Sequence, residues 1–172
     1  MKRFTIVVSI LMITALSFFL PIFQVLTFTE TRTNNPRIYY INVAKDKQFN
    51  IRFTHSIHLS DVIETYEVTD DMKIKLISME YEDVAVGMPA HADEGQTLSY
   101  ENGKYKMYYS DTYLDSFVLY IGDIDMDLFF YYEEREYDLK KTLKRGSSYK
   151  FEVKNISLYD KMKGVPIRNE SR

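Results

Sequence analysis

The sequence predicts an all-β protein, an antiparallel sandwich or flattened barrel, preceded by one N-terminal transmembrane helix. Three observations lead to this fold class. Tyr and Phe are abundant, with 15 and 11 copies, and both favour the half-buried surface of a sheet. Short runs of alternating hydrophobicity recur along the chain, with turn residues between them. One long uncharged stretch stands at the N-terminus.

The uncharged stretch runs from Phe4 to Phe28 and follows Lys2 and Arg3. As a helix it would reach roughly 37 Å, which exceeds the ~30 Å hydrocarbon core of a bilayer. The two cations place the N-terminus in the cytoplasm and the following domain outside it, on the cell membrane. A cleaved signal peptide and a secreted domain are the alternative, with Ala15-Leu16-Ser17 as the cleavage site. Residues 1–28 are therefore expected to be a membrane anchor or a signal peptide.

The rest of the chain divides into three parts. Residues 29–37 are polar, contain the break Asn34-Asn35-Pro36, and are expected to form a stalk. Residues 38–159 are expected to form one extracytoplasmic β-domain. Residues 160–172 mix charges with Gly and Pro and are expected to be a flexible tail.

Alternating runs between turn signals predict the strands of the domain. Asn102-Gly103 gives the strongest hairpin signal, because both residues tolerate positive φ. The expected strands are Ile38–Ala44, Gln48–His55, Val62–Thr69, Lys73–Ala85, Gln96–Tyr100, Tyr105–Ser110, Tyr113–Ile121, Met126–Tyr132, Tyr137–Leu143 and Tyr149–Ile156.

Composition excludes several classes of function. The formal net charge is −3 and no basic stripe is present, so nucleic-acid binding is not expected. The chain has no Cys, which excludes disulfides, thiolate metal sites and a thiol nucleophile. The acidic run Asp123–Asp127 resembles a calcium loop, but Leu128 stands where the sharp turn of such a loop requires Gly. No metal and no cofactor are expected.

The turn after Gln48–His55 brings two polar side chains onto apolar faces. Alternation places His55 and Glu64 on the inward faces of neighbouring strands, and a carboxylate facing a core needs a partner. His55 and Ser56 are the expected partners of Glu64. Two interpretations remain open, a structural role in the turn and a site that contacts a ligand or a partner. Hydrolysis by Ser56, His55 and Glu64 is disfavoured, because adjacent side chains on a strand diverge.

A second candidate lies at the end of a strand, in the segment Ala85–Ala92. Gly87 and Pro89 form a turn, small residues surround them, and His91 follows. As a loop, this segment could close over a polar pocket near His55 and Glu64. The alternative is a turn that only terminates the strand. The predicted binding residues are therefore His55, Ser56, Glu64, Gly87, Pro89 and His91.

These residues also carry a resemblance to a known family. The anchor, Thr54-His55-Ser56-Ile57, Glu64, Gly87-Met88-Pro89 and the closing Gly146 with Phe151-Glu152-Val153 resemble the domain-of-unknown-function 1850 family. The resemblance covers Phe49 to Ile156. It implies no established activity. It does imply an accessory role at the membrane, because members are often encoded beside TAXI-type TRAP solute transporters.

We therefore expect a membrane-anchored accessory or interaction protein rather than an enzyme. Its expected partners are the membrane itself, reached through the N-terminal helix, and transporter subunits or a solute-binding protein. An exported β-domain that binds a small solute is the alternative. A cavity at the His55–Glu64 corner would favour the alternative, and a flat, aromatic-rich exposed face without a cavity would favour a protein partner.

Overall fold

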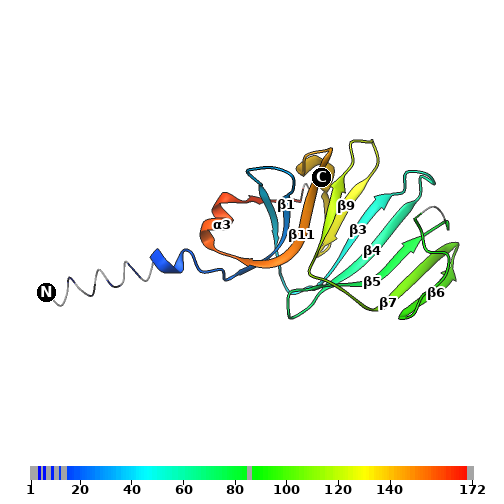
Figure 1. Cartoon of the computed structure of the whole chain (residues 1–172), viewed down its shortest axis with the longest axis horizontal. Helices are drawn as coiled ribbons and strands as arrows, with labels where there is room; N and C mark the ends of the chain where they lie inside the picture. Colours follow the sequence, from blue (N-terminus) through cyan, green and yellow to red (C-terminus); the bar gives the residue numbers. More distant parts are fainter. Residues whose placement is uncertain are drawn as a thin grey trace.

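Alternating apolar residues build the chain into two β-sheets, as the computed structural model shows (Figure 1). The structure describes residues 15–84 and 87–169 and, before them, Phe4, Ile6, Ser9 and Met12. Its strands are β1 Phe23–Glu30, β2 Ile38–Asn42, β3 Gln48–Thr54, β4 Asp61–Val68, β5 Ile74–Tyr81, β6 Gln96–Glu101, β7 Lys104–Leu114, β8 Ser116–Ile121, β9 Leu128–Tyr132, β10 Arg135–Asp138, β11 Ser147–Ile156 and β12 Val165–Pro166. Its helices are α2 Leu139–Thr142 and α3 Leu158–Lys163.

The smaller sheet joins the two ends of the described chain. Its strands lie in the order β12-β2-β1-β11-β8, with β1 antiparallel to both of its neighbours. β12 pairs with β2 in parallel. The larger sheet has the order β10-β9-β3-β4-β5-β7-β6, and its neighbouring strands are all antiparallel.

The core lies between the two sheets and is rich in aromatic rings. Phe28 of the smaller sheet meets Phe130 of the larger one edge to face, with 5.6 Å between ring centroids. Phe49 and Phe151 lie 5.3 Å apart across the same interface. All four side chains are almost fully buried. The predicted sandwich of antiparallel strands is thereby confirmed. Many of the abundant Phe and Tyr residues of the chain pack in this core.

The N-terminal segment differs from the prediction. β1 takes up Phe23–Phe28, which the hydrophobicity pattern assigned to a membrane helix, because Val25, Leu26 and Phe28 are fully buried in the sandwich. Among the described residues, no helix is both long enough and apolar enough to cross a bilayer. Residues 15–17 are helical and are followed by a turn. Lys2 and Arg3, on which the predicted orientation depends, lie outside the described residues.

The predicted stalk and tail are also partly structured. Thr29 and Glu30 belong to β1, and the Thr31 backbone N–H donates to the Ser148 carbonyl over 2.9 Å. At the other end, α3 and β12 occupy the beginning of the predicted tail. Ile167 is buried, and its N–H donates to the Tyr40 carbonyl over 2.9 Å. Residues 170–172 lie outside the described part.

Within the domain, most predicted strands are present with shifted ends. β7 runs continuously through Lys104–Leu114, across the break predicted between Tyr105–Ser110 and Tyr113–Ile121. The predicted strand Tyr113–Ile121 is instead divided at Asp115 between β7 and β8. The predicted strand Tyr137–Leu143 is divided into β10 and α2, because the Asp138 side chain accepts from the N–H groups of Lys140 and Lys141 and starts a helix. β5 ends at Tyr81, and Ala85, the predicted end, lies outside the described residues.

Candidate functional site

The larger sheet carries a second, smaller apolar cluster apart from the main core. Val62, Tyr81 and Met107 form its buried centre. These residues stand on β4, β5 and β7, in the part of the sheet that extends away from β1 and β11 (Figure 1). Partly buried residues packed around this centre include Phe53, Met79, Met88, Leu98, Tyr105 and Tyr109. The Gly-x-Pro turn, represented by Met88, therefore packs onto this cluster.

Glu64 lies on β4 between the main core and this second cluster. Its neighbours in the sheet are Ile51 on β3 and Met79 on β5. The side chain is partly buried, and its Oε2 accepts a hydrogen bond of 2.8 Å from the Tyr66 hydroxyl. Burial raises the pKa of the Glu64 carboxyl, and the bond from Tyr66 opposes that rise.

Aromatic packing fixes the position of the hydroxyl that meets Glu64. The Tyr66 ring stacks on Phe49 at 5.1 Å and on Phe117 at 5.4 Å, which leaves it little freedom to turn. Burial raises the pKa of Tyr66, and the neighbouring Glu64 charge raises it further. Burial and the Glu64 charge also raise the pKa of Tyr109, so Tyr109 lies within the electrostatic reach of the same carboxyl.

His55 does not meet Glu64 as the pattern predicted. The sheet pairs Glu64 with Ile51, four residues before His55, so about 13 Å separate the two backbones along the strands. The partner that the structure gives Glu64 is Tyr66, on the side away from the turn. Alternation places Glu64 and His55 on the same face, but the predicted contact between them is replaced by the tyrosine.

His55 instead helps to shape the turn between β3 and β4. Its N–H donates to the Ser60 carbonyl over 2.8 Å, and its carbonyl accepts from Leu59 over 2.9 Å. Its Nδ1 accepts from the Ile57 N–H over 3.3 Å. Ser56 is exposed within this turn. Backbone hydrogen bonds within the turn therefore close it, and its residues 56–59 are exposed.

One contact joins this turn to the residues just after β5, and another holds the 87–91 segment on the sheet. The His58 ring lies 5.5 Å from the His55 ring, and its Nδ1 is 3.6 Å from Asp83, just after β5. Further along, the Tyr81 hydroxyl donates to the Pro89 carbonyl over 2.5 Å. Tyr81 is itself almost fully buried, so this bond ties the loop to the sheet. Gly87 has φ +89°, a conformation that favours Gly, and both Gly87 and His91 are exposed.

Exposed apolar side chains surround these two turns. Ile57 is 62% exposed and Leu59 is 70% exposed, both in the turn after β3. Val84, next to Asp83, is 42% exposed. We name Ile57, Leu59, Val84 and the segment 87–91 the corner surface. Hydrophobicity patterns did not single out Ile57, Leu59 or Val84, because isolated apolar residues in turns carry no periodic signal.

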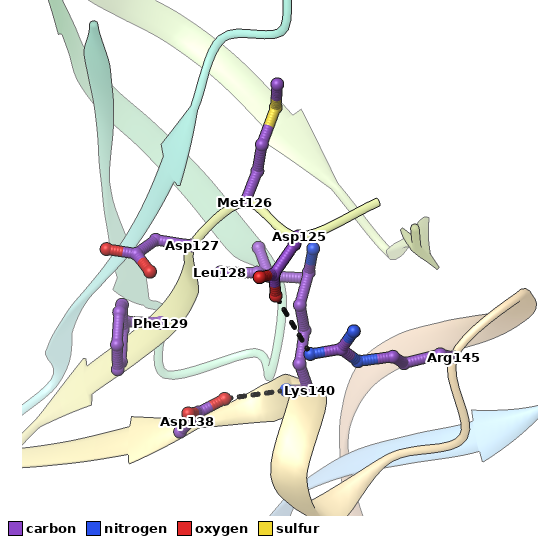
Figure 2. Close-up of a pocket in the computed structure, with 8 residues that line it drawn as sticks. All are labelled: Asp125, Met126, Asp127, Leu128, Phe129, Asp138, Lys140 and Arg145. Atoms are coloured by element: carbon purple, nitrogen blue, oxygen red, sulfur yellow. Dashed lines mark hydrogen bonds and ion pairs between the residues drawn. The ribbon is translucent and has the colours of Figure 1, made fainter. Parts of the chain in front are cut away.

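A polar pocket lies elsewhere, beside the loop between β8 and β9 (Figure 2). It measures about 220 Å³ and is lined by Asp125, Met126, Asp127, Leu128, Phe129, Asp138, Lys140 and Arg145. Its charges pair with one another or with the backbone. Asp125 lies 3.6 Å from Arg145, Asp138 caps α2, and the Lys140 amine donates to the Ile124 carbonyl over 2.7 Å.

Neither this pocket nor the rest of the described chain gathers three ligands of the kind that hold a metal ion. The rim of the pocket does contain an ion-pair network that sequence reasoning missed. Arg52 on β3 pairs with Asp61 at 2.8 Å and with Asp127 at 3.5 Å, and its guanidinium lies 4.8 Å from the centre of the Phe129 ring. These contacts tie β3, β4 and β9 together on the outer face of the larger sheet.

The geometry defines a class of protein, a sandwich of mainly antiparallel strands. Its larger sheet carries an exposed corner surface and, further along β4, a partly buried carboxyl. Comparison with protein families then identifies it further. Residues 49–139, more than half of the chain, match the family described as Domain of unknown function (DUF1850), and the chain belongs to this family. Comparisons with curated proteins and with solved structures give no match.

The matched segment coincides with one part of the fold. It begins in β3 and ends at the first residue of α2, so it contains every strand of the seven-stranded sheet together with β8. β1, β2, β11 and β12 lie outside it. The predicted binding residues and the corner surface all lie within it, so the match covers the sheet that carries the candidate site.

Proposed function

We propose that this protein is a membrane-anchored extracytoplasmic accessory protein that binds another protein through its corner surface. The partner that we propose is a subunit or solute-binding protein of a TRAP-type transporter, in keeping with the family resemblance. The protein is proposed to act by binding and not by catalysis. The N-terminal segment before β1, apolar as far as Ile22, supports its attachment to a membrane.

The exposed apolar residues of the corner surface are the observation that carries this proposal. Ile57, Leu59 and Val84 stand on two turns that the His58–Asp83 pair joins. Exposed apolar side chains with a polar rim are typical of protein interaction sites. The turns are held by backbone hydrogen bonds and by Tyr81, so the surface is formed before a partner arrives and little ordering entropy is lost on binding.

A second function, binding of a small solute, is favoured by Glu64. A carboxyl that is partly buried beside Tyr66 and Tyr109 could recognise a hydroxyl or an amine. The two functions depend on different residues. A protein partner needs the exposed apolar side chains of the corner surface, and a solute needs the Glu64 carboxyl.

Crosslinking in intact membranes tests the proposal. The full chain is compared with a variant carrying Ile57→Asp and Leu59→Asp, and crosslinked proteins are identified by mass spectrometry. The matched control is Val118→Asp with Tyr120→Asp, two residues of similar exposure on β8. We expect the corner variant to lose its crosslink to a transporter component by tenfold or more, since a charge buried at an interface costs more than the ~1.4 kcal/mol that a tenfold loss of affinity represents.

The control variant should keep its crosslink, and both variants should keep the thermal stability of the parent. An undiminished crosslink in the corner variant would contradict the proposal. If Glu64→Gln abolished binding of a solute while both double variants behaved as the parent, the solute-binding function would take its place.

A further inference from the structure

α3 is a short helix with no buried residue, although it packs at the end of the smaller sheet. Leu158 and Met162 stand four residues apart and therefore lie on one face of the helix. Met162 is 72% exposed and Leu158 is 40% exposed. A helix as short as this is not stable by itself in water, because helices in proteins are stabilised by packing of their apolar face. The apolar face of α3 is instead exposed, which suggests that something else covers it.

The chain segment just before β1 joins the same end of the molecule. The rings of Phe18 and Phe19 pack on Tyr159 of α3, at 6.1 and 5.2 Å, and the Tyr159 N–H donates to the Phe18 carbonyl over 3.2 Å. Leu20 and Ile22 follow this contact, and Ile22 is 67% exposed. Figure 1 shows α3 and this segment together, at the end from which the chain leads to its N-terminus.

The charged residues here fit an anionic surface. The Lys163 amine lies 4.3 Å from the centre of the Tyr159 ring, and the Lys161 amine lies 4.6 Å from that of Phe23. The carboxylate of Asp160 is occupied by a capping box with Ser157. Lys amines above aromatic rings, beside exposed aliphatic side chains, are the combination found where proteins meet lipid headgroups.

We propose that Phe19, Leu20, Ile22, Leu158 and Met162 form a membrane-facing platform, which rests in the interface of an anionic lipid bilayer. The inference rests on the membrane attachment of the proposed function and adds where the domain itself touches the lipid. The apolar run before the domain leads directly into the platform, which favours lipid over a soluble partner.

The platform fixes the orientation of the domain. α3 lies at one end of the molecule, and β6 and β7 lie at the other (Figure 1). With the platform on the lipid, the far end of the larger sheet is held away from the membrane surface, where it can be reached by a partner.

The absence of Trp from the chain gives a direct test. The full chain with Met162→Trp is incorporated into vesicles of phosphatidylcholine and phosphatidylglycerol with brominated acyl chains. The matched control is Tyr108→Trp, an exposed aromatic position on β7 at the opposite end. We expect the emission of the Trp at position 162 to fall to about half or less and to shift to the blue, as for side chains at the acyl boundary. The emission of the control should match that in unbrominated vesicles.

The possible outcomes distinguish a failure of the platform from a failure of the membrane anchor. If the protein floats with the vesicles but the two Trp variants behave alike, the platform is refuted while the anchor stands. If the protein does not float with the vesicles, the membrane attachment in the proposed function fails, and the platform fails with it. A blue-shifted Trp at position 162 that bromine does not quench would mean that protein covers this face, and would overturn the lipid contact.

Discussion

Glu64 is a candidate site residue whose position in the fold is unfavourable for its charge. An inward position on a strand between two apolar clusters disfavours its charged form, and burial accordingly raises the pKa of this carboxyl above its ordinary value of 4.5. Tyr66 offsets part of this cost by donating a hydrogen bond, which favours the charged form. A residue tolerated at such a cost is a reasonable place to look for function, as well as a source of pH dependence.

The pH dependence of stability follows from the direction of the Glu64 shift. Because the folded-state pKa is raised, the folded state holds this proton more tightly than the unfolded chain does. The stabilising contribution is complete below pH 4.5 and is lost as pH rises through the folded-state pKa. Glu64→Gln removes this dependence and should be at least as stable as the parent at neutral pH. Urea titrations from pH 4 to 8 measure it, with Glu67→Gln, on the opposite face of β4, as the control.

Removal of the Glu64 side chain has the opposite result. Glu64→Ala deprives the buried Tyr66 hydroxyl of its acceptor, which should lower the free energy of unfolding by about 1–3 kcal/mol. Glu64→Gln keeps an acceptor oxygen, so the two variants should differ at neutral pH. Equal stabilities, measured by thermal unfolding, would mean that the Tyr66 bond contributes nothing.

At the scale of elements, two tight hairpins with different residues make the same turn. Asn102 and Gly103 join β6 to β7 with φ values of +55° and +81°. Glu133 and Glu134 join β9 to β10 with φ values of +49° and +57°. Positive φ is ordinary for Asn-Gly and strained for Glu, so the second hairpin is held by its flanking strands and not by its turn residues.

Exchange of these turn residues tests that difference. Glu133→Asn with Glu134→Gly should stabilise the protein by about 1 kcal/mol and raise Tm by roughly 2–4 °C. The reverse exchange at the first hairpin, Asn102→Glu with Gly103→Glu, should lower Tm by a similar amount. Differential scanning calorimetry on the pair measures both effects, and a fall in Tm for the first variant would show that the Glu side chains make a contact worth more than the strain.

The loop over the second cluster depends on one hydroxyl. Tyr81→Phe keeps the buried ring but removes the donor to the Pro89 carbonyl, which should cost about 1 kcal/mol and free the loop locally. A glutamyl endopeptidase that cuts after Glu94 should then act severalfold faster on the native protein. Tyr105→Phe, on the ring stacked against Tyr81 at 5.6 Å, is the control and should leave the rate unchanged.

At the scale of the whole molecule, the sandwich depends on its N-terminal strand. β1 lies between β2 and β11 and buries Val25, Leu26 and Phe28 completely. A chain that begins at Thr29 loses these three side chains, each worth about 1.5–3 kcal/mol, together with two sheet ladders. That loss is comparable with the whole stability of a domain, about 5–15 kcal/mol. The shortened chain should show no cooperative unfolding by circular dichroism, and a chain that begins at Ile22 should unfold as the parent domain does.

Sequence patterns predicted most of the larger sheet, because its strands alternate and its best hairpin carries Asn-Gly. They missed β1, since a strand buried on both faces reads as the same apolar run as a membrane helix. They missed α3, although its capping box, Ser157 with Asp160, was a readable signal. Glu133-Glu134 has no such signal, because the turn is imposed by its strands.

For the candidate site, pattern reasoning found the inward Glu64 and the turn that follows the strand ending at Tyr81. It assigned the wrong neighbour to Glu64, because alternation gives the face of a residue but not its distance along the ladder. The tie between Tyr81 and Pro89 depends on a loop conformation that no period encodes. The exposed apolar residues at the corner become visible only when two turns are placed side by side.

The position of β1 also determines when, during synthesis of the chain, the sandwich can fold. Phe28 is among the first residues of the domain to leave the ribosome, yet its partner Phe151 is among the last. The central ladder of the smaller sheet therefore closes only after nearly the whole chain has been made, and such a distant pairing has a high entropic cost of closure. Until this pairing forms, the apolar face of the larger sheet is not covered by the smaller sheet. Folding of this chain is thus a late event, and refolding should be slow for its size.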